Sequence, residues 1–255
     1  MEQLVSHPII FFVVSFVLMS LGAWVGAVFL RRDKPLDEDI REDFGVVRAA
    51  TLTLLAIIIG FTLSMAVGRY DQRKNYEEEE ANAIGTEFIR ADLLSSPDAA
   101  NIRSLLTKYL DQRILFYQVR DPQRLREINS TTAELQTELW MAVRTAATAR
   151  PNPLTALAVS GMNDVINSQG YTQAVWWNRI PLAAWLLMTV VALFCNLLVG
   201  YGASSKVSRG PFLLIMPLTV ALSFLLVADI DSPRGGIIRV LPQNLINVAQ
   251  SLPRP

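Results

Sequence analysis

Four stretches of this 255-residue chain contain no charged side chain, and this pattern constrains the fold more than any other feature. They are Ile9–Leu30, Ala49–Gly68, Ile180–Gly202 and Pro211–Ala228. A helix needs about 20 apolar residues to cross a hydrocarbon core of about 30 Å, so each stretch is long enough or nearly so. One Asp or Arg at the centre of such a helix costs roughly 2.5–3.5 kcal/mol on insertion scales. The pattern therefore predicts four transmembrane helices in two hairpins.

A polar segment with helical periodicity separates the two hairpins. Three helix starts are marked by a capping residue followed by proline, and they are Ser96-Pro97, Asp121-Pro122 and Asn152-Pro153. No strand-like alternation interrupts them. We therefore expect an all-α membrane protein with an inserted helical domain. The predicted division is 1–68 for the first hairpin, 69–179 for the aqueous domain, 180–228 for the second hairpin and 229–255 for a C-terminal tail.

An even number of spans places both termini and the aqueous domain on one side of the membrane. Arg31–Val47 and Ala203–Gly210 then lie on the opposite side. Basic residues flank the spans on both faces, so the positive-inside rule does not decide which face is cytoplasmic.

Composition and motifs argue against several classes of function. The formal net charge is zero and no basic patch carries interleaved aromatic residues, so we expect no nucleic-acid partner. The single histidine, His7, lies next to a proline, and no metal-ligand spacing, phosphate loop or nucleophile motif is present. We therefore expect no enzyme activity and no cofactor. Asp229 and Asp231 are weak candidates for a calcium site, because two acids are few for such a site. A cap at the end of the span or an ion pair with Arg234 is the simpler interpretation.

The second stretch carries two sets of residues at four-residue spacing. The first set, Thr53, Ile57 and Phe61, is expected to share one face of the helix. The second set consists of small residues, Gly60, Ser64 and Gly68, and is expected to share another face. In an oligomer the first set could form an apolar constriction that closes a pore by dewetting, while the small set admits a neighbouring helix. The alternative is a well-packed span in a closed bundle. Gly22 and Gly26 form a similar pair, either a dimer face or, as we prefer, close packing within the chain.

Four consecutive acids, Glu77–Glu80, follow the second span. In a ring of identical subunits they could form a vestibule that concentrates cations. The alternative is a solvated helix face, with Arg73 and Lys74 pairing at i,i+4 spacing.

The segment from Gly60 to Asp71, which includes Arg69 and Tyr70, resembles the bacterial membrane proteins described as bestrophin-like. The acids Glu77–Glu80 and the following run fit the same pattern, with Asn82, Gly85 and Arg90 as motif residues. The ending from Ala228 to Val240 fits as well. More distantly, the chain is similar to bestrophins, which are pentameric ion channels that are mostly anion-selective.

The resemblance implies a neck at Thr53, Ile57 and Phe61, with a threonine where bestrophins carry a large apolar residue. It also implies a bacterial inner-membrane location with the helical domain and both termini in the cytoplasm. We therefore predict a passive, homo-oligomeric ion channel, pentameric by analogy, whose partners are the lipid bilayer, other copies of itself and small inorganic ions. The acids favour cations, whereas the resemblance favours anions. The alternative function is a non-conducting membrane scaffold or sensor whose helical domain binds a partner.

Overall fold

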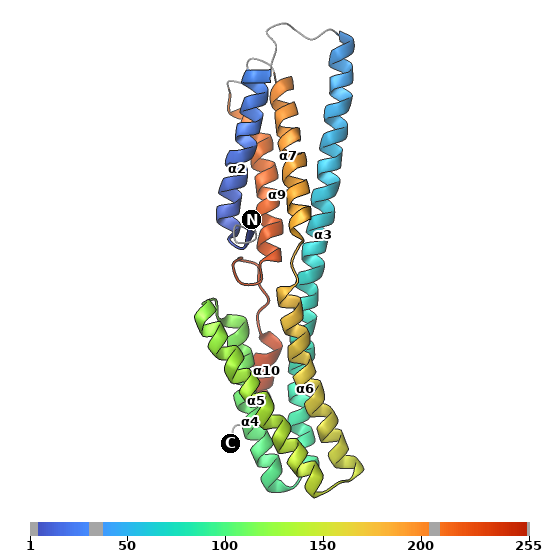
Figure 1. The fold of residues 1–255 in the computed structure, drawn as a ribbon, viewed down its shortest axis with the longest axis vertical. Coiled ribbons are helices and arrows are strands. Elements are labelled where there is room, and N and C mark those ends of the chain that lie inside the picture. Colours follow the sequence, from blue (N-terminus) through green and yellow to red (C-terminus); the bar gives the residue numbers. More distant parts are fainter. Residues whose placement is uncertain (1–4, 31–37, 204–209, 254–255) are drawn as a thin grey trace. The chain divides into compact units, whose positions relative to one another are not determined.

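The computed structural model describes residues 5–30, 38–203 and 210–253, and this part of the chain is helical with no strand (Figure 1). The elements are α2 (Pro8–Val25), η1 (Gly26–Leu30), α3 (Glu38–Arg90), η2 (Ala91–Leu93), α4 (Ser96–Gln118), α5 (Pro122–Ala149), α6 (Pro153–Trp177), α7 (Leu182–Gly202), η3 (Pro211–Leu214), α9 (Ile215–Asp231) and α10 (Gln243–Ser251). The basic residues Arg31, Arg32 and Lys34 of the first connection lie outside the described residues.

The chain divides into two compact units, both of which include part of α3. The membrane unit comprises Met1–Tyr70 and Arg179–Arg239, and the helical unit comprises Asp71–Asn178 and Val240–Pro255. The C-terminal segment 229–255 is therefore not a separate tail, because its first part belongs to the membrane unit and its last part to the helical unit. Four helical segments are long and apolar enough to span a bilayer, and they are Pro8–Leu30, Arg41–Leu93, Pro153–Gly202 and Pro211–Asp231.

In the membrane unit, α2 packs against both α7 and α9. Phe11 on α2 lies at the centre of an aromatic cluster, with ring centroids 5.1 Å from Trp185 and 6.0 Å from Phe224. Just beyond the end of α2, a Cβ on Gly26, the first residue of η1, would overlap the backbone of α7 at Leu197. The glycines of α2 thus permit a close crossing within the chain, which is the reason small residues recur there.

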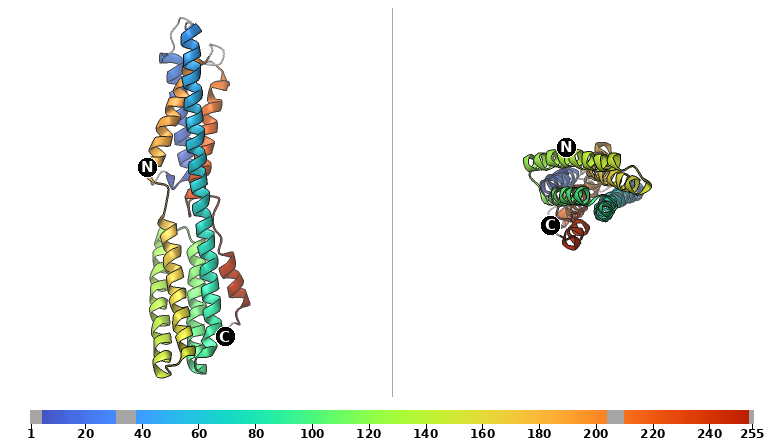
Figure 2. Two further views of the ribbon diagram at one scale, coloured as in Figure 1. Left: turned by 90° about the vertical axis from the view of Figure 1, so that its right-hand side faces the viewer. Right: turned by 90° about the horizontal axis from the view of Figure 1, so that it is seen from below.

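In the helical unit, α4 packs against α5 and α5 packs against α6 (Figure 2). The caps follow the sequence signals, since Asp121 accepts a hydrogen bond from the backbone N–H of Arg124 at 2.8 Å and Asn152 forms a capping box with Thr155. For α4 the N-cap is Ser95 rather than Ser96, so the predicted start is displaced by one residue. Large apolar side chains, among them Ile102 and Leu139, are fully buried between these helices.

Three local features go beyond the sequence pattern. The helix that carries the second charge-free stretch is much longer than the stretch itself, because α3 runs from Glu38 to Arg90 and is not interrupted at any of its glycines. Pro217 lies in the first turn of α9, which begins at Ile215, so it occupies a position where no backbone N–H is needed for the helix. The C-terminal segment contains a helix, α10, that its prolines and glycines obscured.

Candidate functional site

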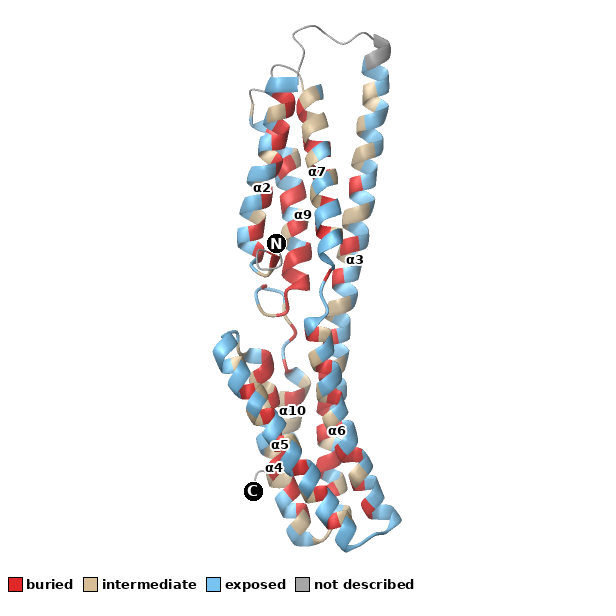
Figure 3. Cartoon of the chain, in the orientation of Figure 1, coloured by how far each residue is buried: buried red, intermediate tan, exposed pale blue. Residues whose placement is uncertain are grey.

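Much of α3 within the span is exposed or half-buried (Figure 3). The exposed positions include all six residues that the sequence singled out in this span. They are Thr53, Ile57, Gly60, Phe61, Ser64 and Gly68, and each is exposed. At 3.6 residues per turn the six positions fall within an arc of about 100°. The expectation of two separate faces was therefore wrong, because small and bulky residues interleave in a single outward stripe. We call these six residues the α3 stripe.

The opposite side of α3 packs into the membrane unit. Leu55, Thr62 and Ala66 are buried, and the Thr62 hydroxyl donates to the Ile58 carbonyl at 2.7 Å. The Thr53 hydroxyl on the outward side likewise donates to its own helix, to the Ala49 carbonyl at 2.9 Å. The threonine in the stripe therefore satisfies its own donor and offers its methyl group to whatever lies outside.

Glycines behave differently on α2 and on α3. A Cβ on Gly22 would lie 3.1 Å from the Leu193 side chain, and one on Gly26 would overlap α7. A Cβ on Gly60 or Gly68 would meet nothing within 4 Å. The chain itself thus covers Gly22 and Gly26, whereas Gly60 and Gly68 of α3 meet no other described part of the chain.

Where α3 passes the end of the span, Arg69 lies 3.5 Å from Asp231, whose side chain is 2% exposed. Asp231 also accepts from the Ile180 backbone N–H, at 3.2 Å to each oxygen. Asp229 accepts from the N–H groups of Ile237 and Ile238 at 2.8 and 2.7 Å. Both carboxylates are thus surrounded by hydrogen-bond donors, the opposite of a cation site, and they fasten the chain around the ends of α7 and α9. Among the described residues, no three His, Cys, Asp or Glu side chains gather to hold a metal ion.

The four acids after the span divide into two pairs. Glu78 and Glu79 are exposed, whereas Glu77 and Glu80 are buried inside the helical unit. Glu77 accepts hydrogen bonds from the Asn244 side chain at 2.6 Å and from the Leu245 backbone N–H at 3.0 Å, which fixes the start of α10. The expectation that all four acids face an aqueous vestibule is therefore wrong for Glu77 and Glu80.

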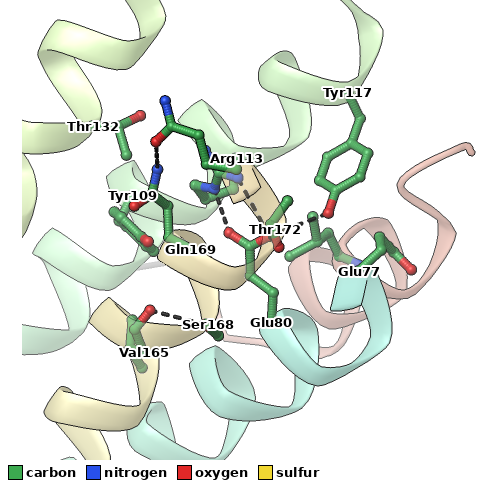
Figure 4. A network of polar contacts seen from close by, with 12 residues as sticks. Glu77, Glu80, Tyr109, Arg113, Tyr117, Thr132, Val165, Ser168, Gln169 and Thr172 are labelled. Carbon is green, nitrogen blue, oxygen red and sulfur yellow. Dashed lines mark hydrogen bonds and ion pairs between the residues drawn. The ribbon is translucent and has the colours of Figure 1, made fainter. Parts of the chain in front are cut away.

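Glu80 is the centre of a buried polar network (Figure 4). It forms an ion pair with Arg113 of α4, and both side chains are fully buried. Its Oε2 also accepts from the Tyr117 hydroxyl at 3.3 Å and from the Thr172 hydroxyl at 3.1 Å. The network therefore joins α3, α4 and α6 through one carboxylate.

The charges of this network reinforce one another. Burial opposes the positive charge of Arg113, but the Glu80 carboxylate together with Tyr109 and Tyr117 outweighs this effect and raises the pKa of the guanidinium above its usual value. Burial and the same carboxylate raise the pKa of Tyr117, so its hydroxyl stays protonated and keeps donating. The function of this cluster is structural, because every described charge in it is paired.

The other motif residues lie along the rest of α3. Asp71 is exposed and Tyr70 is half-buried. Gly85 faces Val248 of α10, with ordinary contact distances of 3.6 Å or more from a Cβ added there. Asn82 and Arg90 line a recess of about 240 Å³ together with Ala83, Thr86 and Asp164.

Sequence reasoning missed four functional or structural residues in the helical unit: Glu87, Arg113, Tyr117 and Thr172. Each carries a polar group at a fully or largely buried position. The available signal was periodicity, since Arg113 lies on the face of α4 that also carries Leu106, Tyr109 and Leu110. A charged residue inside an apolar stripe indicates a buried partner, although the sequence does not say which one.

Comparisons with known proteins identify the family and the fold of this chain. The family described as Bestrophin-like domain matches residues 13–245, so the chain belongs to that family. The fold is that of a bacterial bestrophin homologue from Klebsiella pneumoniae, with a TM-score of 0.66 at 16% identity over 94% of this chain and 99% of that one. The crystal structure of a membrane protein variant gives a TM-score of 0.63 at 14% identity over 93% of this chain and 98% of that one. A search of curated proteins found no match. This chain is therefore a membrane protein of the bestrophin fold.

Proposed function

We propose that this protein is a passive ion channel rather than an enzyme, formed by several copies of the chain around a central axis. Membership of the Bestrophin-like domain family and the fold shared with a bacterial bestrophin homologue support a channel. The pentameric state is taken by analogy with bestrophins. In this proposal the membrane is the bacterial inner membrane, and the helical unit and both termini are cytoplasmic.

The observation that carries the proposal is the α3 stripe. A span that faces lipid alone gains nothing from glycine or serine, whereas small residues let neighbouring helices approach closely. On α2 the glycines are covered by α7, but on α3 Gly60 and Gly68 are open within the chain. The apolar segment of α3 is also the least buried of the four candidate spans, since 17% of it is buried within the single chain, against 28–39% for the others. The small residues of this stripe would allow a second copy of the chain to pack closely against α3.

Along the same stripe, Ile57 and Phe61 supply the constriction, with Phe61 72% exposed within the single chain. A ring of such side chains excludes water when narrow and passes hydrated ions when it widens. Thr53, one turn away, makes the neck wider or wetter at its level. Glu78 and Glu79 remain as the acids that can face water near the mouth, since Glu77 and Glu80 are committed inside the helical unit.

Two measurements test the proposal. Native mass measurement of the purified protein in detergent gives the number of copies, and a monomer contradicts the channel and favours the scaffold or sensor. In planar bilayers, we expect Ile57→Ala and Phe61→Ala to raise the conductance because each shortens the apolar barrier. Phe194→Ala is the matched control, since Phe194 is an exposed phenylalanine of α7 that lies off the stripe. Equal currents for Phe61→Ala and the unchanged protein would exclude the neck.

A further inference from the structure

One buried acid of the helical unit has no described function in the fold. The Glu87 side chain is fully buried, and neither carboxyl oxygen has a hydrogen-bond partner. This contrasts with Glu77 and Glu80, which accept two or more hydrogen bonds each. An ionised carboxylate without donors is costly inside a protein, so this group is held in its neutral form.

The surroundings of Glu87 contain one cation and one further acid. Arg90 follows one turn later on α3, and its Nη1 lies 3.8 Å from an Asp164 oxygen on α6. That ion pair is long and partly exposed, at 34% for Arg90 and 62% for Asp164. It is therefore weak, and the guanidinium is free to exchange partners at little cost.

Gly161 of α6 lies against both the Glu87 carboxyl and the Arg90 guanidinium. A Cβ at this position would overlap both the Glu87 carboxyl and the Arg90 guanidinium. Both groups therefore lie against the same backbone, within a short side-chain rotation of each other. A glycine here has a steric reason, since any larger residue would fill the space that the two groups share.

We propose that Glu87, Arg90 and Asp164 form a proton-operated switch in which loss of the Glu87 proton transfers Arg90 from Asp164 to Glu87. In the protonated state Arg90 pairs across to α6. In the deprotonated state it pairs with an acid of its own helix at i,i+3 spacing, and Asp164 is released to solvent. The only chemical change is the loss or gain of one proton by the Glu87 carboxyl, and that proton passes to or from the surrounding water.

The other charges near Glu87 do not replace Arg90. Arg103 of α4 donates to the Phe88 carbonyl at 3.2 Å and lies 2.5 Å from Asp92, so it is engaged elsewhere. The helix α10, which packs nearby at Gly85, has no ionisable side chain. Burial raises the pKa of Glu87 to about 8, with Arg90 lowering it and Asp164 raising it. Proton release therefore falls within the range of pH that cells reach.

The switch has a direct structural output. Arg90 and Asp164 line the recess of about 240 Å³ that also contains Asn82, Ala83 and Thr86. Their ion pair joins two of the residues that line this recess, and its loss removes the link between α3 and α6 at that point. The inference does not depend on ion conduction, because it concerns only the helical unit.

The test is infrared difference spectroscopy of the whole protein in detergent between pH 5 and pH 10. A protonated carboxyl has a C=O band well separated from those of carboxylates. We expect a band that disappears with a midpoint near pH 8 and is absent in Glu87→Gln. Glu79→Gln, which removes an exposed acid of the same helix, is the matched control and should leave the band unchanged.

Two charge variants test the exchange of partners, and they do not require that Glu87→Gln folds. Asp164→Asn should lower the midpoint, because it removes a repelling charge and a competitor for Arg90. Arg90→Gln should raise the midpoint or abolish the transition below pH 10. A midpoint below pH 5.5 in the unchanged protein would show that Glu87 is ionised and overturn the proposal. A midpoint near pH 8 that neither variant moves would overturn the switch.

Discussion

Removal of one partner from the Glu80–Arg113 pair should destabilise the helical unit more than any exposed charge does. In Glu80→Gln the guanidinium of Arg113 stays in place, fully buried, with no anion beside it. Breaking a buried ion pair from one side typically costs about 3–5 kcal/mol, because the desolvation of the remaining charge is no longer offset. The loss of the hydrogen bonds from Tyr117 and Thr172 to a full carboxylate adds to this cost.

Removal of both charges together should cost less stability than removal of one charge alone. In Glu80→Leu with Arg113→Met the apolar groups replace both ions, so no unpaired charge is buried. Such exchanges are often neutral or stabilising when the volumes match. The two hydroxyl groups then lose their acceptor, at roughly 1 kcal/mol each. We therefore expect the double variant to be more stable than Glu80→Gln, although not more stable than the unchanged protein.

Tryptophan fluorescence during heating in detergent measures this effect near the site. Trp176 reports on it directly, since its ring lies 5.4 Å from the Tyr117 ring and 5.0 Å from the Phe116 ring. A change of 1 kcal/mol shifts the melting temperature by about 2–4 °C for a chain of this size, so Glu80→Gln should lower it by at least about 6 °C. Asp92→Asn, which breaks the exposed pair with Arg103, is the control and should cost less than about 1 kcal/mol. Equal shifts for the buried and the exposed variant would refute the reasoning.

Four further predictions concern the effects of single substitutions and of pH. Glu77→Ala removes the acceptor that holds the first turn of α10, so hydrogen exchange of residues 243–251 should become faster while α4 keeps its protection. Gly26→Ala should destabilise the membrane unit, because the added methyl overlaps α7, whereas Gly60→Leu should leave the single chain folded and reduce assembly measured by native mass. Asn152→Ala should cost about 1 kcal/mol in thermal stability, through loss of the cap of α6. Because the folded pKa of Glu87 is raised from 4.5 to about 8, the folded state keeps a proton that the unfolded chain loses between these values. Thermal stability should therefore fall as pH rises through this window, by at most about 5 kcal/mol, and the fall should vanish in Glu87→Gln.

Most of the helices could be predicted because their signals are local. Charge-free stretches define the spans, and Asp121-Pro122 and Asn152-Pro153 mark helix starts whose capping bonds are formed within three residues. The helix α10 was missed because its start depends on a distant acceptor, Glu77, rather than on a cap of its own. For Asp229 and Asp231 the sequence suggested an end cap but not the partners, since these acids accept from N–H groups that only the folded chain brings near.

The misreading of the acids has a physical cause that the helix itself explains. From Leu55 onward, a set of buried residues of α3 recurs at three-, four- and seven-residue steps, and its members are Leu55, Thr62, Ala66, Arg73, Glu77, Glu80, Ile84 and Glu87, with Ala81 and Phe88 buried beside them. This is one continuous face of a single helix, apolar in the span and charged beyond it. Charge alone suggested solvent for Glu77–Glu80, but the period of the span, extended past Gly68, selects Glu77 and Glu80 and passes over Glu78 and Glu79. The same period leaves the α3 stripe on the opposite side of the helix. The fold of the single chain therefore accounts for the acids on the buried face, whereas the described chain leaves Gly60 and Gly68 on the outward face uncovered, which is where the proposed channel places a neighbouring copy.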